Sequence, residues 1–317
     1  MTNKIPLLVI VGPTAVGKTN LSIKIAKKLD GEIISADSMQ IYKYMNIGTA
    51  KITKDEMEGV PHYLIDNVAP DEDFSVSDFK RLADFYIHDI HKRNKLPIVV
   101  GGTGLYINSI VYDLDFTVAA ADLKFREKIN ILADNNGNDY IYEELRKIDP
   151  SSADRINPND RKRIIRALEV FYETGKPMSD YYKNFRKLND KYNIVMLGLN
   201  MDRKKLYDRI NKRVDKMIDD GLLNEINDLI KMGYDEGLNS MQALGYKEII
   251  SYYKGNTSLE EAVDLIKKNS RKYAKRQLTW FRRDNRIKWI CIDEYDNKNE
   301  VFESIIKYIR EKFENNN

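Results

Sequence analysis

The sequence predicts an α/β fold in which helices flank a parallel sheet and a helical insertion domain interrupts the chain. Three observations predict it. Apolar runs of strand length alternate with amphipathic runs of helical length at both ends of the chain, a glycine-rich loop joins the first strand to the first helix, and a polar, helical stretch lies between. We therefore expect a core of residues 1–118 and 194–317 and an insertion of residues 119–193.

The first strand and helix enclose a phosphate-binding motif. Residues 7–11 are apolar, the pattern G-x-x-x-x-G-K-T follows, and apolar residues then recur at helical spacing to Leu29, with Gly31 expected as the C-cap. Loop amides and the helix N-terminus attract anions, Lys18 adds a cation, and the Thr19 hydroxyl is placed to ligate Mg²⁺. The sequence thus predicts a P-loop NTPase-like site for a phosphate ester or diphosphate, formed by Gly12, Pro13, Thr14, Ala15, Val16, Gly17, Lys18 and Thr19.

A second expected strand, residues 32–36, leads into Asp37. Ligands of open α/β sheets bind beyond the carboxyl ends of the strands, so Asp37 should lie on the same rim as the phosphate loop. Asp37 could serve there as a proton acceptor, or it could simply cap a turn. Its place on the rim favours chemistry.

The remaining elements follow from periodicity and cap signals. We expect a helix over residues 77–93, capped by Ser75 or Ser77, and a strand over 96–100 that ends in Gly101-Gly102-Thr103-Gly104. In the insertion, residues 160–174 form the most regular helix and end at Gly175. Further along we expect strands at 194–199 and 287–292, helices at 203–219, 222–232, 240–254 and 258–280, and a last helix from about 299.

Composition excludes several classes of protein. The chain of 317 residues is 42% hydrophobic and 32% charged, which is ordinary for a globular protein, and no stretch is apolar enough to span a membrane. A single cysteine, Cys291, excludes a disulfide framework and a cysteine-based zinc site. The first strand begins without a signal peptide. We therefore expect a cytoplasmic protein, and we expect a monomer because no exposed apolar stripe calls for a partner.

Positive charge is concentrated although the net charge is only +3. Ten Lys and Arg residues and one acid lie between Lys267 and Lys288, interleaved with aromatic residues, and a second basic run covers 161–166. Each run could be a solvated face or a surface for an RNA backbone. On the expected helix 203–219, Arg209 and Arg213 share a face, where a solvated row paired with Asp208 or Asp215 is the simpler interpretation.

Several segments together resemble one enzyme family, the tRNA dimethylallyltransferases (tRNA isopentenyltransferases), in their bacterial form. The phosphate loop belongs to this set, and the matches occur in family order over nearly the whole chain. The other segments are Ser35-Ala36-Asp37-Ser38-Met39-Gln40-Ile41-Tyr42, Ile47-Gly48-Thr49-Ala50-Lys51, Gly101-Gly102-Thr103-Gly104-Leu105-Tyr106, Arg166-Ala167-Leu168-Glu169-Val170 and Lys275-Arg276-Gln277-Leu278-Thr279-Trp280-Phe281-Arg282.

The resemblance implies a reaction and roles for particular residues. A dimethylallyl group would pass from dimethylallyl diphosphate to N6 of the adenosine 3′-adjacent to the anticodon of tRNA, with Mg²⁺. Asp37 would accept the amine proton, while Lys18, Thr19 with Mg²⁺, and Arg213 would stabilise the leaving diphosphate. The anticodon stem-loop would contact Asp37, Ser38, Met39, Gln40, Thr103, Arg126, Arg161, Lys162, Arg163, Ile164, Ile165, Arg166, Gly245, Tyr246 and Lys247.

Two other functions fit part of the pattern. A small-molecule or nucleotide kinase would hold ATP in the loop, but the strand before Gly101 ends in glycines and not in the aspartate that such kinases place there to hold Mg²⁺. A non-catalytic RNA-binding protein with a vestigial loop would not need Lys18, Thr19 and Asp37 together.

Overall fold

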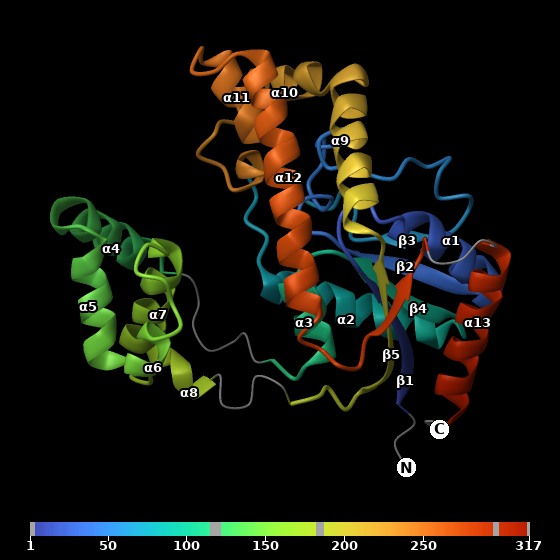
Figure 1. Cartoon of the computed structure of the whole chain (residues 1–317). Coiled ribbons are helices and arrows are strands. Elements are labelled where there is room, and N and C mark those ends of the chain that lie inside the picture. The colour runs from blue at the N-terminus through green and yellow to red at the C-terminus, as the bar shows by residue number, and fades with distance from the viewer. Residues whose placement is uncertain (1–3, 115–121, 182–186, 294–297, 316–317) are drawn as a thin grey trace. The chain divides into compact units, whose positions relative to one another are not determined.

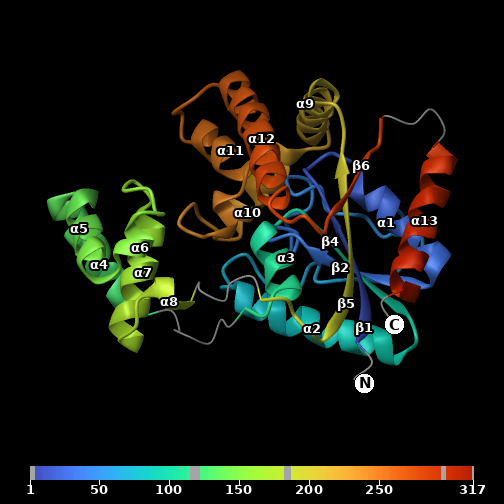
Figure 2. The same ribbon diagram turned by 60° about the horizontal axis from the view of Figure 1, so that its bottom comes forward.

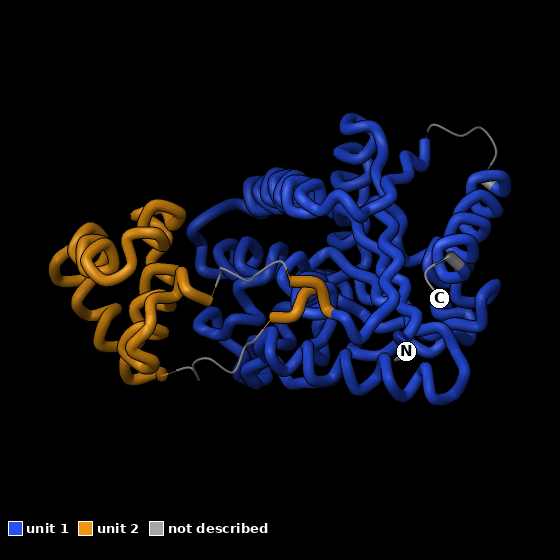
Figure 3. The backbone as a smooth tube through the Cα atoms, turned by 90° about the horizontal axis from the view of Figure 1, so that it is seen from below, with its two compact units in different colours: residues 1–111, 190–317 blue, residues 112–189 orange. Residues whose placement is uncertain are grey.

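The computed structural model describes residues 4–114, 122–181, 187–293 and 298–315. They form two compact units (Figure 3): residues 1–111 and 190–317 make unit 1, and residues 112–189 make unit 2. The division falls near the expected one, at 111/112 and 189/190. The expected boundary between residues 118 and 119 lies outside the described residues. No helix in the described ranges is long and apolar enough to cross a membrane.

Unit 1 is built on a six-stranded, fully parallel sheet with the order β3-β2-β4-β1-β5-β6 (Figure 1). This confirms the predicted α/β class. The strands are β1 (Ile5–Val11), β2 (Gly31–Ala36), β3 (His62–Tyr63), β4 (Leu96–Gly101), β5 (Tyr192–Asn200) and β6 (Lys288–Cys291).

The register of the central strands creates the functional edge. Val11 of β1 pairs with Gly101 of β4, and Gly101 also pairs with Ala36 of β2. Three strands therefore end at the same level. The loops that begin at Gly12, Asp37 and Gly102 consequently leave the sheet side by side, as parallel pairing requires.

Helices cover the sheet because its strands are apolar on both faces. Leu8 and Ile10 of β1 share a core with Ile25 and Ile305, whereas the alternate residues of β1 point to the opposite face, where α2 packs against β1 and β4 (Figure 2). The helices of unit 1 are α1 (Lys18–Leu29), α2 (Val76–Lys92), α3 (Gly104–Val111), α9 (Arg203–Asp219), α10 (Leu222–Lys231), α11 (Tyr246–Tyr253), α12 (Leu259–Phe281) and α13 (Lys298–Asn315), with a 3₁₀ turn η1 (Ser240–Gln242).

Most expected helix ends are confirmed, and two expectations are wrong. Ser75 caps α2 in a capping box with Asp78, as the sequence allows. Helix α1 ends at Leu29, and its C-cap is Asp30, which adopts the left-handed conformation itself, so Gly31 already belongs to β2. The helix expected over residues 240–254 breaks into η1 and α11, because the backbone turns extended at Ala243 and Gly245 has a φ of +95°.

Unit 2 is helical, as expected for the insertion. It contains α4 (Leu123–Asn136), α5 (Asn138–Ile148), α6 (Pro150–Ala153), α7 (Arg161–Thr174) and α8 (Met178–Tyr181). Its own core includes Ile129, Leu145, Ile164 and Leu168. Asp160 caps the start of α7, and Gly175 ends it in the left-handed conformation, which glycine adopts without steric cost.

Candidate active site

The phosphate loop depends on two glycines with positive φ. Gly12 has a φ of +148°, and a Cβ there would lie 2.7 Å from the carbonyl oxygen of Leu199, so no side chain fits between β1 and β5 at this point. Gly17 has a φ of +105° immediately before α1 begins. The two residues bend the loop around the N-terminus of α1, where unpaired amide groups and the helix dipole favour an anion.

Lys18 lies in this loop, and no acid among the described residues forms an ion pair with it. Its ammonium group donates hydrogen bonds to the carbonyl oxygens of Gly12 at 2.9 Å and Pro13 at 2.8 Å. Burial lowers the pKa of Lys18 to about 8; the carboxylate of Asp37 opposes this shift and Arg213 adds to it. An anion bound in the loop would restore the ordinary preference of Lys18 for the charged form.

Asp37 follows β2 directly, caps a turn and lines the pocket. Its Oδ1 atom accepts hydrogen bonds from the backbone amides of Met39 at 2.9 Å and Gln40 at 3.4 Å, which makes it the cap of a turn. Asp37 also lines the same pocket as Lys18 and Thr19. Its other oxygen, Oδ2, accepts no hydrogen bond from the described residues and is available for a substrate.

The loop after β4 meets the loop after β2 through a glycine and a threonine. A Cβ on Gly101 would lie 2.1 Å from the carbonyl oxygen of Ala36, so only glycine permits this approach. The hydroxyl oxygen of Thr103 accepts a hydrogen bond from the Ser38 amide at 3.1 Å, and the Thr103 amide donates to Ala36. Thr103 therefore stabilises the segment that carries Asp37.

Helix α12 contributes two residues, Gln277 and Tyr273, that no sequence pattern placed at the site. The Gln277 side chain accepts a hydrogen bond from the Thr14 amide at 2.8 Å and donates one to the Gly102 carbonyl at 3.0 Å, so it ties the phosphate loop to the loop after β4. Tyr273 also lines the pocket, and burial together with the Asp37 carboxylate raises its pKa to about 12. In the sequence, Gln277 lies in one of the segments that resemble the enzyme family. Tyr273 is notable there only as an aromatic residue among basic ones.

Helix α9 lines the other side of the pocket with a row of cations: Arg209, Lys212, Arg213 and Lys216. Within the described part of the chain, neither Arg209 nor Arg213 forms an ion pair, and Asp215 pairs instead with Lys267 at 2.6 Å. The expected pairing with Asp208 or Asp215 is therefore wrong, although Arg209, Lys212 and Lys216 are exposed and Lys216 pairs with Asp220 at 2.9 Å. Burial lowers the pKa of Arg213, and Asp37 partly opposes this shift.

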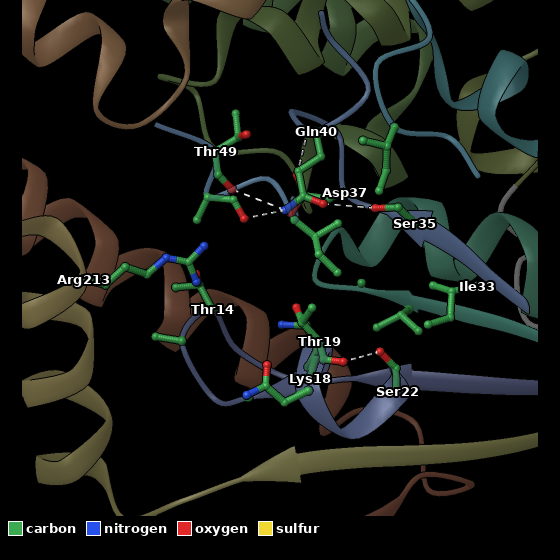
Figure 4. A pocket seen from close by; sticks show the side chains of 18 of the residues that line it. Thr14, Lys18, Thr19, Ser22, Ile33, Ser35, Asp37, Gln40, Thr49 and Arg213 are labelled. Atoms are coloured by element: carbon green, nitrogen blue, oxygen red, sulfur yellow. Dashed lines mark hydrogen bonds between the residues drawn. The ribbon is translucent and has the colours of Figure 1, made fainter. Parts of the chain in front are cut away.

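These elements enclose a pocket of about 480 Å³. Figure 4 shows Asp37 and Gln40 on one side of it, Lys18 and Thr19 on the opposite side, and Arg213 reaching in from α9. Apolar side chains line it as well, among them Ile33, Ile52, Ile65 and Val100. The pocket thus combines one carboxylate, five cations and a hydrocarbon surface, and it could hold a strongly anionic, partly apolar ligand beside a proton acceptor.

Three residues expected to contact RNA have side chains that cannot do so in this fold. Ile164 and Ile165 are buried in the core of unit 2, because the helical period turns them inward. Tyr246 is completely buried, and its hydroxyl donates to Glu225 at 2.7 Å. Gly245 is buried beside it, and its amide donates to Glu248, whereas Lys247 is exposed.

Several arginines of unit 2 form ion pairs within the unit. Arg126 and Arg166 bind the two oxygens of the buried Glu169, with shortest distances of 2.7 and 2.6 Å. Arg161 pairs with Asp134 at 2.5 Å. Lys162 and Arg163 are exposed, and Arg163 makes only a 3.3 Å contact with Asp160. The basic run therefore divides into residues that hold the unit together and two that face solvent.

Comparison with known proteins places these features in one group of enzymes. The family model described as "IPP transferase" matches residues 40–284. The tRNA dimethylallyltransferase of Thermoanaerobacter sp. strain X514 is 55% identical over 310 residues, 97% of this chain and 98% of the relative. That of Acetivibrio thermocellus is 52% identical over 303 residues, 96% of this chain and 97% of the relative.

Solved structures agree with the sequence relatives. The crystal structure of the full-length tRNA isopentenylpyrophosphate transferase from Bacillus halodurans has a TM-score of 0.75 and 46% identity, and the match covers 98% of both chains. A eukaryotic dimethylallyltransferase acting on tRNA has a TM-score of 0.74 and 35% identity, with 87% of this chain and 69% of that chain covered.

Proposed function

The chain belongs to the tRNA dimethylallyltransferase family, and we propose that it transfers a dimethylallyl group from dimethylallyl diphosphate to N6 of the adenosine 3′-adjacent to the anticodon of tRNA. One observation carries this proposal: Asp37 lines the same pocket as Lys18, Thr19 and Arg213. Transfer of a prenyl group to an amine needs a proton acceptor and a stabilised diphosphate leaving group on opposite sides of the reacting carbon.

Asp37 is the residue proposed to act on the acceptor. The exocyclic amine of adenine is a weak nucleophile because its lone pair is delocalised into the ring. As the N6–C1 bond forms, the bond between C1 and the diphosphate oxygen breaks and its electron pair leaves with the diphosphate. The proton of N6 passes to Oδ2 of Asp37, the oxygen that the turn does not use.

The leaving diphosphate is proposed to lie in the phosphate loop. The loop amides, Lys18 and Arg213 would contact its oxygens, and Lys18 would give up its bonds to the Gly12 and Pro13 carbonyls to do so. The hydrocarbon chain would pack against apolar residues of the pocket such as Ile33 and Ile52.

We include Mg²⁺ in this proposal, held by Thr19, the diphosphate and water. The described residues contain no cluster of three His, Cys, Asp or Glu side chains that could hold a metal by themselves. Mg²⁺ suits the donors that are present, because it keeps several waters and is often bound through one or two protein oxygens and substrate phosphates. When bound, it would neutralise charge that develops on the diphosphate.

The tRNA substrate must present an unstacked base to this pocket. Bases of a single-stranded anticodon loop can turn out of their stack at modest cost, which a base in a duplex cannot. The kinase alternative lacks such support: the relatives are named for prenyl transfer to tRNA, and β4 ends in Gly101 followed by Gly102.

Transfer can be tested with two labelled donors in parallel. The protein is incubated with tRNA and Mg²⁺, once with labelled dimethylallyl diphosphate and once with γ-labelled ATP. We expect label in tRNA from the prenyl donor alone. Transfer of the γ-phosphate to tRNA or a small acceptor would support a kinase, and tight tRNA binding without transfer of either label would support a non-catalytic RNA-binding protein.

A further inference from the structure

Glu225, in the first turn of α10, binds a loop that lies far from it in the sequence. One carboxylate oxygen accepts hydrogen bonds from the amides of Asn46 at 2.8 Å and Ile47 at 2.7 Å. The other accepts from the amide of Gly48 at 3.1 Å and from the hydroxyl of Tyr246 at 2.7 Å. Three consecutive backbone amides and a phenol thus converge on one side chain. Backbone amides rarely point to one place unless an anion organises them.

Tyr246 makes the arrangement rigid. It is completely buried, and burial together with the nearby Glu225 carboxylate raises its pKa well above the ordinary value. Its hydroxyl therefore stays protonated and donates a hydrogen bond to Glu225 at physiological pH. A Cβ on Gly48 would lie 2.4 Å from the ring of Tyr246, so the backbone of the loop packs directly on the aromatic face. The four hydrogen bonds to Glu225 have a charged acceptor, and such hydrogen bonds are about twice as strong as those between neutral groups.

The bound loop continues into the wall of the pocket. The amide of Ala50 donates to the carbonyl oxygen of Ile47 at 2.9 Å, and the Thr49 hydroxyl donates to that of Met45 at 2.6 Å. Ala50 has a φ of +46°, which is unfavourable for alanine and needs support from its surroundings. Glu225 supplies that support from outside the pocket.

The carbonyl groups of this loop fix the side-chain amide of Gln40. Its nitrogen donates to the carbonyl oxygens of Thr49 and Ala50, both at 3.3 Å, and its oxygen accepts from the Ser35 hydroxyl at 3.3 Å (Figure 4). Both amide protons are therefore used. Among the described residues the oxygen accepts only the Ser35 bond, so one of its two acceptor positions is left, and Gln40 lines the pocket.

We propose that Glu225 is a positioning residue that fixes the orientation of the Gln40 amide and so makes this side of the pocket select a base with an exocyclic amino group. This inference rests on the proposed function. A fixed oxygen acceptor favours the amino group of adenine and repels a keto oxygen at the same place. If the loop lost Glu225, the amide could rotate and offer its nitrogen instead, and the Gln40 side of the pocket would no longer distinguish an amino group from a keto group.

Binding of two anticodon stem-loops tests the proposal. They differ only at the target position, which carries adenosine in one and inosine in the other, so that the 6-amino group is replaced by a keto oxygen and N1 gains a hydrogen. For the wild-type chain we expect adenosine to be preferred by about tenfold, which corresponds to the loss of one buried hydrogen bond. In Glu225→Ala the preference should fall to less than about threefold, while the affinity for dimethylallyl diphosphate stays within twofold of wild type.

Matched variants separate positioning from general damage. Asp228→Asn lies on the same helix, removes an exposed ion pair with Lys231, and should leave the base preference unchanged. Glu225→Gln keeps one acceptor oxygen and should give an intermediate preference, as should Tyr246→Phe. If Glu225→Ala fails to fold, these two variants decide the question.

The outcomes are distinguishable from failure of the proposed function. A wild-type chain that transfers no prenyl group to the adenosine stem-loop contradicts the proposed function. A wild-type chain that transfers the group and prefers adenosine, while folded Glu225 variants keep the full preference, overturns the role of Glu225 alone. If the Glu225 variants lost affinity for dimethylallyl diphosphate in parallel with the base preference, the positioning role of Glu225 would also be overturned, because Glu225 would then support the whole pocket.

Discussion

The pocket of unit 1 and helix α7 of unit 2 are both rich in cations, but they use them differently. In the described part of the pocket, Lys18 and Arg213 form no ion pair although burial lowers the pKa of each. In unit 2, Arg126 and Arg166 bind the carboxylate of Glu169, whose side chain is 1% exposed. A buried cation without an acidic partner costs folding free energy until an anionic ligand binds to it. A cation that is paired with an acid instead contributes to the fold.

The difference shows that a basic run is not by itself a binding surface. In unit 2, Arg126 and Arg166 stabilise the packing of α4 on α7 through Glu169. Within the basic run 161–166, Lys162 and Arg163 are exposed, and among the described residues Arg163 makes only a 3.3 Å contact with Asp160. In unit 1 the cations converge on a pocket that also contains an acid. The four predictions below test this distinction, beginning with the largest effect.

Replacing the one acid of the pocket should cause the largest loss. In Asp37→Asn the turn to Met39 can persist, because the amide oxygen still accepts, but no proton acceptor remains. We expect transfer to fall by about 10²–10⁴-fold, while diphosphate affinity measured by calorimetry stays close to wild type. A parallel loss of diphosphate affinity would show instead that Asp37 acts mainly through the turn.

Removing the paired acid of unit 2 should affect stability instead of chemistry. Glu169→Ala leaves Arg126 and Arg166 without their shared carboxylate and should destabilise unit 2 by about 3 kcal/mol, the low end for a buried pair because both arginines are partly exposed. Hydrogen exchange of the α4 and α7 amides measures this locally. Glu173→Gln, an exposed position on the same helix, should change stability by less than about 0.5 kcal/mol. Equal exchange rates in the two variants would contradict the structural role.

The sequence predicts the local parts of this architecture well and the distant contacts poorly. The strand, loop and helix around Lys18 follow from adjacent residues, and parallel strand ends explain why Asp37 lies beside the loop. The bonds of Gln277 to Thr14 and of Glu225 to Asn46 join positions 263 and 179 residues apart, which no local pattern reveals. Helical periodicity predicts that Ile164 and Ile165 are buried. Treating the basic run 161–166 as one RNA-binding segment instead ignores the face of the helix on which each residue lies.

The lowered pKa of Lys18 predicts a pH-dependent affinity. Below pH 8 Lys18 is protonated and diphosphate binding should not depend on its titration. Above pH 8 Lys18 loses this proton in the free protein but keeps it in the diphosphate complex. Affinity should therefore weaken by up to about tenfold per pH unit, with uptake of a proton on binding. Calorimetry in buffers of different ionisation enthalpy measures both effects. Lys18→Ala should bind more weakly and without this dependence; an unchanged pH profile in that variant would assign the titration to another group.

The smallest expected effect comes from the exposed cations of unit 2. Lys162→Ala combined with Arg163→Ala removes the two residues of the basic run that face solvent, without disturbing Glu169. If they contact tRNA phosphates, the slope of log affinity against log salt should decrease in magnitude by about 1.5, because each contact releases most of one counterion. Arg161→Ala, which breaks the pair with Asp134, should act mainly on stability and leave the slope nearly unchanged. A double variant with the wild-type slope would show that tRNA does not contact this face of α7, and the basic run would then serve only the fold of unit 2.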